Sequence, residues 1–285
     1  MDGIICINKP KGITSFDVVR KLKKLLKEKR IGHTGTLDPL ATGVMIICVG
    51  RATKMVQDLE GKDKDYLAGF DLGYKTDTYD TEGTIIAKKD FEIINKDDLE
   101  KVLDNFKGKI KQVPPMYSAL KVDGKRLYDL AREGIVIERK ERDVEIATLT
   151  LESFNGRSGE LFCSVSKGTY IRSLIYDIGE TLEVYATMTA LNRTRVGDTP
   201  LSKCYTLEEI ENMCNESNFD FMFSVENYFN YPKIEIITDE HLKYYRNGNS
   251  FSFTELDGLY SVYYKDEFIG LGSIEKNRLK GYKYF

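Results

Sequence analysis

The chain is organised around one short stretch, Gly32-His33-Thr34-Gly35-Thr36-Leu37-Asp38-Pro39-Leu40-Ala41-Thr42-Gly43, which runs directly into the apolar segment Val44-Met45-Ile46-Ile47-Cys48-Val49. Its glycines and its proline permit backbone conformations that other residues resist, so we expect a constrained loop before a buried strand. Such a loop would present the carboxylate of Asp38. Taken alone, the pattern better describes a turn in which the aspartate makes local backbone hydrogen bonds. The other segments of the chain must decide between a catalytic and a structural aspartate.

The bulk composition is that of an ordinary globular protein. A length of 285 residues suits one large domain, or one domain with a small appendage, and is ample for a packed core. The net charge of -3 and the isoelectric point near 5.7 give no overall attraction for nucleic acid. A basic patch, if the chain has one, must therefore be local.

Cysteine and histidine usage argues against a metal centre and against a disulfide framework. The chain has 2 histidines, and its cysteines are widely spaced without a C-x-x-C pair. The N-terminus lacks the basic start of a signal peptide, and no apolar run is long enough to span a bilayer. We therefore expect a soluble, cytoplasmic protein with reduced thiols, no metal and no membrane contact.

Periodic segments flank the loop on both sides. Residues 16–30 carry apolar side chains at helical spacing and basic side chains on the opposite side, which predicts an amphipathic helix. The basic side is either a solvated face or a surface for phosphates. Residues 64–72 alternate as in a half-buried strand, with Tyr66 facing inward, where its ring forms part of either the core or the wall of a pocket.

Three further segments carry charge in unusual places. Residues 73–83 are rich in Thr and Asp and predict a hydrogen-bonded turn network rather than an EF-hand. Residues 121–142 gather lysines and arginines, which indicates either a basic insertion that folds over a polyanion or an ordinary surface loop. Arg172 falls at the start of a predicted helix, where the helix dipole disfavours a cation, so we expect it to have an acidic partner.

The chain changes character from about residue 231. Short alternating stretches follow one another with turns at Lys265-Asp266 and Lys276-Asn277, which predicts a small β-rich domain of roughly fifty residues. We therefore divide the chain into residues 1–230 and residues 231–285. A unit of this small size is expected to pack on its neighbour.

Four segments of this chain occur in the same order in one known family. They are the stretch 32–43, Pro114-Pro115-Met116-Tyr117-Ser118-Ala119, Lys167-Gly168-Thr169-Tyr170-Ile171-Arg172 and Arg193-Thr194-Arg195-Val196-Gly197. Over about residues 3–200 the chain resembles TruB-type tRNA pseudouridine synthases, and residues 231–285 resemble the PUA RNA-binding domain in position and strand content. The resemblance implies an α+β fold, with a mixed, mainly antiparallel central sheet flanked by helices and loops and a small β-rich C-terminal domain.

The resemblance implies an isomerase that converts the T-loop uridine of tRNA, at position 55, to pseudouridine without a cofactor. The base is flipped out of the RNA, its N1–C1′ bond breaks, and C5 bonds to C1′. Asp38 matches the catalytic aspartate, which either attacks C1′ or removes the C2′ proton. Arg172 matches the arginine that keeps this carboxylate charged. Tyr66 matches the tyrosine that stacks on the base, and its hydroxyl is a candidate acceptor for the C5 proton.

Other residues match contacts with the RNA. His33 resembles a histidine that enters the T-loop, although a structural loop histidine fits the bare pattern equally well, and Tyr170 is expected to pack under the pocket or to position Asp38. Asn192 replaces the first arginine of the family's common Arg-Arg-Thr-Arg-Val-Gly motif, which leaves open how much the basic patch around Arg193 adds to RNA affinity. The candidate contacts for backbone phosphates are Lys9, Lys24, Lys121, Arg126, Arg132 and Arg142.

The implied partner is the T-arm of tRNA, bound by a monomer that needs no partner protein. Two other functions stay open. One is an RNA-binding protein or tRNA-folding chaperone that grips a flipped base without turning it over. The other is a guide-dependent relative that modifies ribosomal RNA, which is disfavoured because segment 121–142 resembles the insertion by which stand-alone enzymes hold tRNA.

Overall fold

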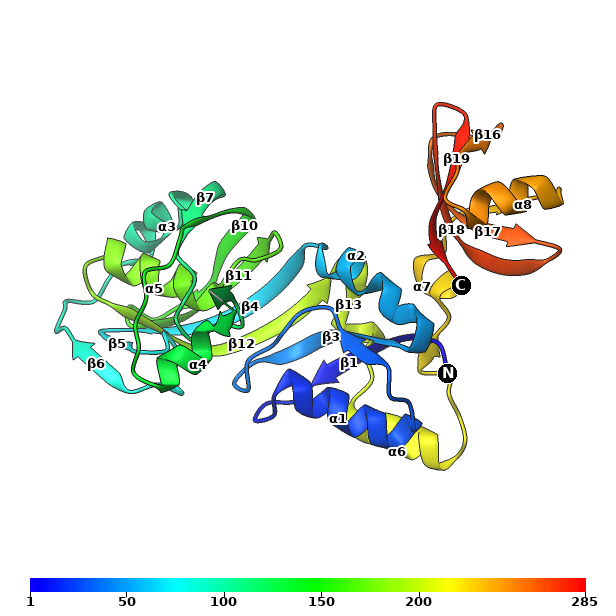
Figure 1. The fold of residues 1–285 in the computed structure, drawn as a ribbon. Coiled ribbons are helices and arrows are strands. Elements are labelled where there is room, and N and C mark those ends of the chain that lie inside the picture. The colour runs from blue at the N-terminus through cyan, green and yellow to red at the C-terminus, as the bar shows by residue number, and fades with distance from the viewer. Residues whose placement is uncertain (123) are drawn as a thin grey trace.

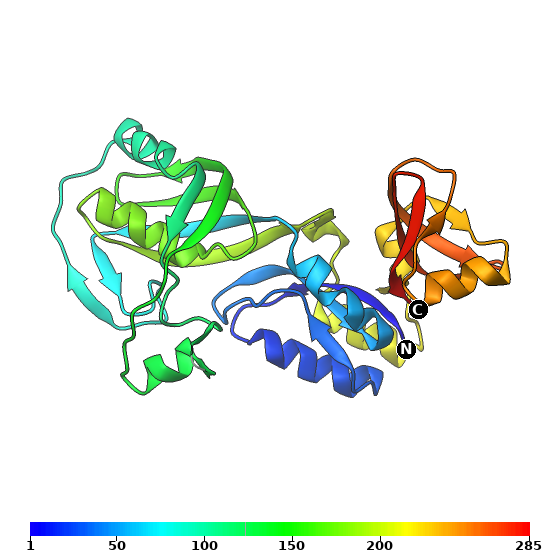
Figure 2. The same ribbon diagram turned by 45° about the horizontal axis from the view of Figure 1, so that its top comes forward.

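The computed structural model describes residues 1–122 and 124–285. It shows one large mixed sheet with helices packed on it, followed by a smaller sheet at the C-terminus (Figure 1). The C-terminal sheet stands at the opposite end of the molecule from helices α3 (Lys96–Asp104) and α5 (Ile171–Thr181), as both views show (Figure 2). In the described ranges, no helix is long and apolar enough to cross a membrane.

The large sheet is mainly antiparallel, as predicted. Its one parallel pair among the described strands joins β12 to β3 and so connects the two halves of the sheet. In pairing order, its main path runs through β14 (Met222–Phe223), β1 (Gly3–Lys9), β3 (Thr42–Val49), β12 (Ala186–Val196), β4 (Lys64–Leu72), β11 (Ser158–Val165), β10 (Arg142–Phe154) and β7 (Gly108–Gln112), with β2 (Ile31–His33) on β3 and β13 (Thr199–Pro200) on β12.

Strand β3 is buried on both faces, which explains why its sequence is a continuous apolar run rather than an alternating one. Met45 and Ile47 belong to a core that includes Leu22 of the first helix. Val44 and Ile46 face the other way, into a second core that includes Leu271 of the C-terminal sheet. The strand after the glycine-rich loop is therefore anchored in two cores.

The first helix begins where predicted but ends earlier. Helix α1 spans Ser15–Leu26 and begins at a capping box between Thr14 and Asp17. Lys27 adopts the left-handed conformation with φ 52° and ends the helix, so the predicted extension to residue 30 is wrong. A left-handed lysine leaves no signal in the hydrophobic spacing.

The remaining helices and short strands lie between the strands of the large sheet and after its last long strand. The turn network expected over residues 73–83 lies between β5 and β6 and is confirmed by the bonds among Thr76, Thr78 and Asp80. The elements are η1 (Gly50–Met55), α2 (Val56–Glu60), β5 (Tyr74–Thr76), β6 (Ile85–Lys88), β8 (Lys121–Val122), β9 (Lys125–Arg126), α4 (Leu127–Arg132), η2 (Leu201–Lys203), α6 (Leu207–Asn215) and α7 (Val225–Phe229).

The C-terminal residues form a five-stranded sheet with its own apolar core. Both predicted turns are present, because Lys265, Asp266, Lys276 and Asn277 all have positive φ. The sheet pairs in the order β15 (Lys233–Glu235), β17 (Gly258–Tyr264), β18 (Glu267–Glu275), β19 (Arg278–Tyr284) and β16 (Phe251–Ser252), and α8 (Asp239–Arg246) packs beside it.

Candidate active site

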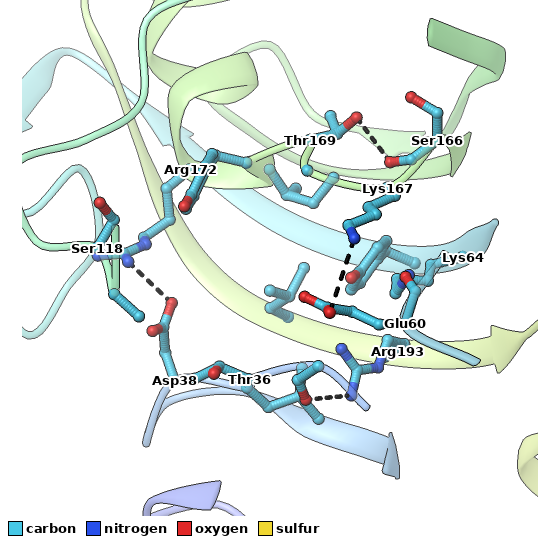
Figure 3. A pocket seen from close by; sticks show the side chains of 18 of the residues that line it. Thr36, Asp38, Glu60, Lys64, Ser118, Ser166, Lys167, Thr169, Arg172 and Arg193 are labelled. Carbon is cyan, nitrogen blue, oxygen red and sulfur yellow. Dashed lines mark hydrogen bonds and ion pairs between the residues drawn. The ribbon is translucent and has the colours of Figure 1, made fainter. Parts of the chain in front are cut away.

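The glycine-rich loop, the start of α5 and strands β4 and β12 line a pocket of about 340 Å³ (Figure 3). The pocket brings together four residues that the sequence predicted for the site, Asp38, Tyr66, Tyr170 and Arg172. Candidate Arg142 lies on its rim, in the first position of β10. In the described ranges, no group of three or more His, Cys, Asp or Glu side chains is arranged to hold a metal ion.

Main-chain bonds fix the loop on both sides of Asp38. The Ser15 hydroxyl accepts a hydrogen bond from the Leu37 N–H at 2.8 Å and donates one to the Leu37 carbonyl at 2.9 Å. The Gly12 N–H donates to the Pro39 carbonyl at 2.8 Å. The residues before and after Asp38 are therefore both held by the start of the chain.

Gly43 is required where the loop enters β3. Its φ is +102°, and a Cβ atom there would lie 2.2 Å from the Arg193 carbonyl oxygen. Only glycine therefore allows β3 to approach β12 this closely.

Arg172 has two acidic partners rather than the one expected. Its Nη2 lies 3.0 Å from Asp38 Oδ2, and its Nη1 lies 3.2 Å from Asp80 Oδ2. It also donates to the carbonyls of Thr78 and Tyr117, at 3.1 and 2.7 Å. Partners from three segments thus hold the buried guanidinium beside the candidate catalytic carboxylate. Figure 3 shows the contact between Arg172 and Asp38.

Asp80 is the site residue that the sequence did not identify. It is 2 % exposed, and its Oδ1 accepts bonds from the Thr78 hydroxyl at 2.6 Å and the Glu82 N–H at 3.1 Å. The Thr/Asp-rich composition signalled the turn network, but nothing in it signalled that the network reaches Arg172, 92 positions away.

The electrostatics of Asp38 balance two opposing effects. Burial raises the pKa of its carboxyl, and the Arg172 guanidinium opposes that rise. The Asp80 carboxylate adds to the increase in pKa. The ionised form therefore depends on Arg172.

Two tyrosines form walls of the pocket. Tyr66 is 7 % exposed and pairs across the sheet with Arg193 and with Cys163. Burial raises the pKa of its phenol, which the Arg193 charge opposes. The Tyr170 backbone is held at both ends by the Gln112 side chain, which accepts from its N–H at 2.8 Å and donates to its carbonyl at 3.1 Å.

His33 and Lys9 lie near the loop but do not line the pocket. His33 ends β2, and its Nδ1 accepts a bond from the Gly35 N–H at 3.4 Å. Lys9 is 0 % exposed, and its ammonium donates to the carbonyls of Pro10 and Ile13 at 2.9 and 2.7 Å. Because a phosphate cannot reach a fully buried ammonium, the prediction of Lys9 as a phosphate contact is wrong.

The other candidate phosphate contacts are spread over the surface. Lys24 is exposed on α1. Three further candidates, Lys121, Arg126 and Arg132, line a separate hollow on β8, β9 and α4, of about 660 Å³. Of the candidate cations in segment 121–142, Arg142 therefore lines the pocket that holds Asp38, and the other three line a separate hollow.

Of the two arginines in the basic patch, Arg193 is buried, whereas Arg195 is partly exposed and paired with a carboxylate. Arg193 is 2 % exposed and donates to the carbonyls of Val44 and Gly35 at 2.7 and 3.3 Å. Arg195 forms a two-pronged ion pair with Asp65, at 2.5 and 2.6 Å. Arg193 therefore lines the pocket and presents no charge to the outer surface.

Comparisons with known proteins identify the family of this chain. Residues 23–171 match the model of the TruB family pseudouridylate synthase N-terminal domain, and residues 172–222 match the tRNA pseudouridylate synthase B C-terminal domain. The chain is 56 % identical to tRNA pseudouridine synthase B of Fusobacterium nucleatum subsp. nucleatum, with 100 % of each chain covered. It is 43 % identical to that of Clostridium kluyveri, again with 100 % of each covered.

Solved structures confirm the predicted fold class. A Cbf5-Nop10-Gar1 complex contains a chain that is 26 % identical, with a TM-score of 0.69 and coverage of 99 % of this chain and 83 % of that one. A structure of an H/ACA RNP bound to a substrate RNA gives a TM-score of 0.70 at 24 % identity, over 99 % and 84 % of the two chains. This chain therefore belongs to the TruB family of pseudouridine synthases, which are isomerases.

Proposed function

We propose that this chain isomerises the T-loop uridine at position 55 of tRNA to pseudouridine, as a cytoplasmic monomer that needs no cofactor, partner protein or guide RNA. The observation that carries the proposal is the Asp38 carboxylate, held 3.0 Å from Arg172 in a pocket that Tyr66 also lines. The curated relatives that match over their whole length carry the name of this activity.

The reaction needs an ionised carboxylate near the sugar. Asp38 either attacks C1′ to form an ester or takes the C2′ proton to form a glycal, and the N1–C1′ bond breaks in both routes. The freed base turns in the pocket and C5 bonds to C1′. Arg172 keeps Asp38 charged against the effect of burial.

A flipped base needs a surface that compensates for lost stacking. Tyr66 offers its ring for this purpose, and stacking of a base on an aromatic side chain contributes about 1–3 kcal/mol. We assign to Tyr66 the acceptance of the C5 proton as a second role, and to Tyr170 the support of the pocket floor.

The RNA outside the pocket meets other parts of the chain. We assign His33 to the space left by the flipped nucleotide, and the exposed cations Lys24, Lys121, Arg126, Arg132 and Arg142 to backbone phosphates. In this proposal residues 1–230 are the catalytic domain, with the basic insertion 121–142, and residues 231–285 are a PUA-like RNA-binding domain.

The Asp38→Asn variant tests the proposal on a bare tRNA transcript carrying uridine tritiated at C5. We expect no release of tritium above background, with binding of the transcript within about threefold of wild type, because the amide keeps the size but loses the charge. The matched control is Asp90→Asn, which changes an exposed aspartate and should leave the rate unchanged. Full activity of Asp38→Asn would refute the assigned mechanism.

The wild-type chain in the same assay separates the alternatives. Tight binding of the T-arm without tritium release would indicate an RNA chaperone. A requirement for an added guide RNA would indicate a guide-dependent pseudouridine synthase. This outcome is tested because the chain is structurally similar to a chain of the Cbf5-Nop10-Gar1 complex. Release from bare tRNA supports the stand-alone enzyme.

A further inference from the structure

The end of the pocket away from Asp38 is lined by two buried cations. Figure 3 shows Asp38 and Arg172 on one side, and Lys64 of β4 and Arg193 of β12 on the other. Lys64 is 7 % exposed and Arg193 is 2 % exposed. Both flank Tyr66, since Arg193 is its partner across the sheet and Lys64 precedes it by two positions on the same buried face.

Among the described residues no carboxylate pairs directly with either cation, and the Glu60 and Asp63 carboxylates raise the pKa of Lys64 only through longer-range charge effects. In the described part of the chain, no Asp or Glu oxygen forms an ion pair with Lys64 or Arg193, and Glu60 pairs instead with Lys167 at 3.6 Å. The Lys64 ammonium donates only to the carbonyls of Glu60 and Lys62, at 3.0 and 2.6 Å. Carbonyl dipoles solvate a cation but do not cancel its charge, so two buried positive charges remain beside Tyr66.

This arrangement is unfavourable for the empty protein. Burial and, to a smaller extent, the Arg193 charge together lower the pKa of the Lys64 ammonium to about 8. The group is therefore still largely protonated at neutral pH. Buried charges without a partner of opposite charge lower the stability of a protein, and they are found at functional sites, where the ligand or the reaction supplies that partner.

The isomerisation generates the complementary charge. When N1–C1′ breaks, its electron pair stays on N1 and spreads to the ring carbonyl oxygens, so the base becomes an anion. In the ester route the Asp38 oxygen bonds to C1′, and in the glycal route Asp38 takes the C2′ proton as C1′=C2′ forms. Both routes release the same uracil anion. In the ester route, C5 then bonds to C1′ as the bond between C1′ and the Asp38 oxygen breaks. In the glycal route, C5 bonds to C1′ as the C1′=C2′ double bond opens and Asp38 returns its proton to C2′. A base finally removes the C5 proton, and N1 gains a proton.

We propose that Lys64 and Arg193 stabilise the negative charge that develops on the uracil ring as its bond to the ribose breaks. The inference rests on the proposed function and holds for either role of Asp38. Fixed cations aimed at a developing anion, in a pocket largely closed to water, lower the barrier without reorganising during the reaction. The pocket thus places a carboxylate beside the sugar and two cations beside the base.

The experiment compares uridine with 5-fluorouridine at the target position of the same transcript. Fluorine acidifies the ring, so the anion of 5-fluorouracil needs less stabilisation by the protein. The rate of N1–C1′ cleavage is measured in single turnover for wild type, Lys64→Met and Arg193→Gln. We expect each variant to be slower on uridine by about 10²–10³-fold, as for loss of one oxyanion donor, and at least about tenfold less impaired on 5-fluorouridine.

A purely structural role gives a different result. If either side chain only held the loop or the sheet in place, its replacement would slow N1–C1′ cleavage by the same factor for both substrates. That result would overturn the inference for that residue. Retention of full activity on uridine would overturn it as well. The conservative variants Lys64→Arg and Arg193→Lys keep the charge and should recover most of the rate, which guards against a variant that fails to fold.

The matched control is Lys62→Met, which makes the same change two positions from Lys64 in an exposed side chain outside the pocket. It should cleave both substrates at the wild-type rate. A wild-type chain that cleaves neither substrate would instead refute the proposed function. The two failures are therefore distinguishable.

Discussion

Asp38 carries its charge in surroundings that oppose it. Burial and the Asp80 carboxylate both favour the neutral acid, and Arg172 is the closest opposing charge. Arg172 is also shared, because the same guanidinium neutralises Asp80 from its other nitrogen. At the scale of single residues, the reactivity of Asp38 is therefore a property of three side chains.

The Arg172→Lys variant tests this dependence. A lysine keeps one charge but cannot reach both carboxylates, so the pKa of Asp38 should rise. Because Asp38 acts in its ionised form, the rate is lost as the pH falls through its pKa, and a higher pKa moves the acidic limb to higher pH. The measurement is the pH profile of single-turnover pseudouridine formation.

The difference in single-turnover rate between wild type and Arg172→Lys should become smaller as the pH is raised. A deficit that is the same at every pH would contradict the assigned role and indicate a structural defect instead. Arg51→Lys is the matched control, because Arg51 is an ion-paired but exposed arginine that lies 2.7 Å from Asp2.

At the scale of elements, the catalytic loop depends on the close approach of β3 to β12. These strands form the parallel pair of the large sheet, with Asn192 and Arg193 opposite Thr42 and Gly43. Arg193 then donates to the carbonyls of Gly35 and Val44, which stand at the two ends of the loop. The loop is thus closed at its base by one side chain.

The Gly43→Ala variant tests the tight approach. The new methyl group would meet the Arg193 carbonyl at 2.2 Å, so β3 or β12 must shift. We expect the free energy of unfolding to fall by clearly more than about 1 kcal/mol, together with a loss of activity. Chemical denaturation and the tritium assay measure both effects.

Gly12→Ala separates backbone strain from steric clash. Gly12 also has a positive φ, +88°, but a Cβ there would meet nothing within 4 Å. The Gly12→Ala variant should therefore lower the free energy of unfolding by about 1 kcal/mol, through backbone strain alone. Equal destabilisation by the two variants would show that the contact between β3 and β12 is not the reason for the glycine.

At the scale of the whole molecule, the C-terminal sheet completes a core of the large domain. Leu271 of β18 is fully buried in the cluster that contains Ile4 and Val44. Lys283 adds an ion pair with Asp58 at 2.9 Å. The two parts are therefore joined by apolar packing and by polar contacts, which include hydrogen bonds between Lys54 and the end of β19.

Deletion of residues 231–285 should consequently destabilise the part that remains. We expect a chain of residues 1–230 to unfold at a lower temperature than the full chain, because the apolar face beneath β1 and β3 becomes exposed. Circular dichroism melting measures the difference. Lys283→Met is the control and should change the free energy of unfolding by only about 0–1 kcal/mol, since it removes a partly exposed ion pair. An unchanged melting temperature of the truncated chain would show that the two parts fold independently.

Local pattern was enough to predict most elements and part of the site. The alternation over residues 64–72 predicted β4 with its observed bounds, and the awkward position of Arg172 predicted an acidic partner. The early end of α1 was missed because it depends on the backbone of Lys27 alone. The wrong prediction for Lys9 arose because a lysine in a basic turn looks the same in sequence whether it is buried or exposed.

Only the folded chain shows that Asp80 pairs with Arg172 and that Lys64 and Arg193 line the pocket. Arg172 meets Asp80 across 92 positions, and Arg193 meets Val44 across 149. Periodicity reports which face of a strand is buried, and it depends on neighbours a few residues apart. The register of β12 against β3 and β4 decides which buried face carries a charged side chain and which distant group pairs with it. That register is set by the packing of the whole sheet.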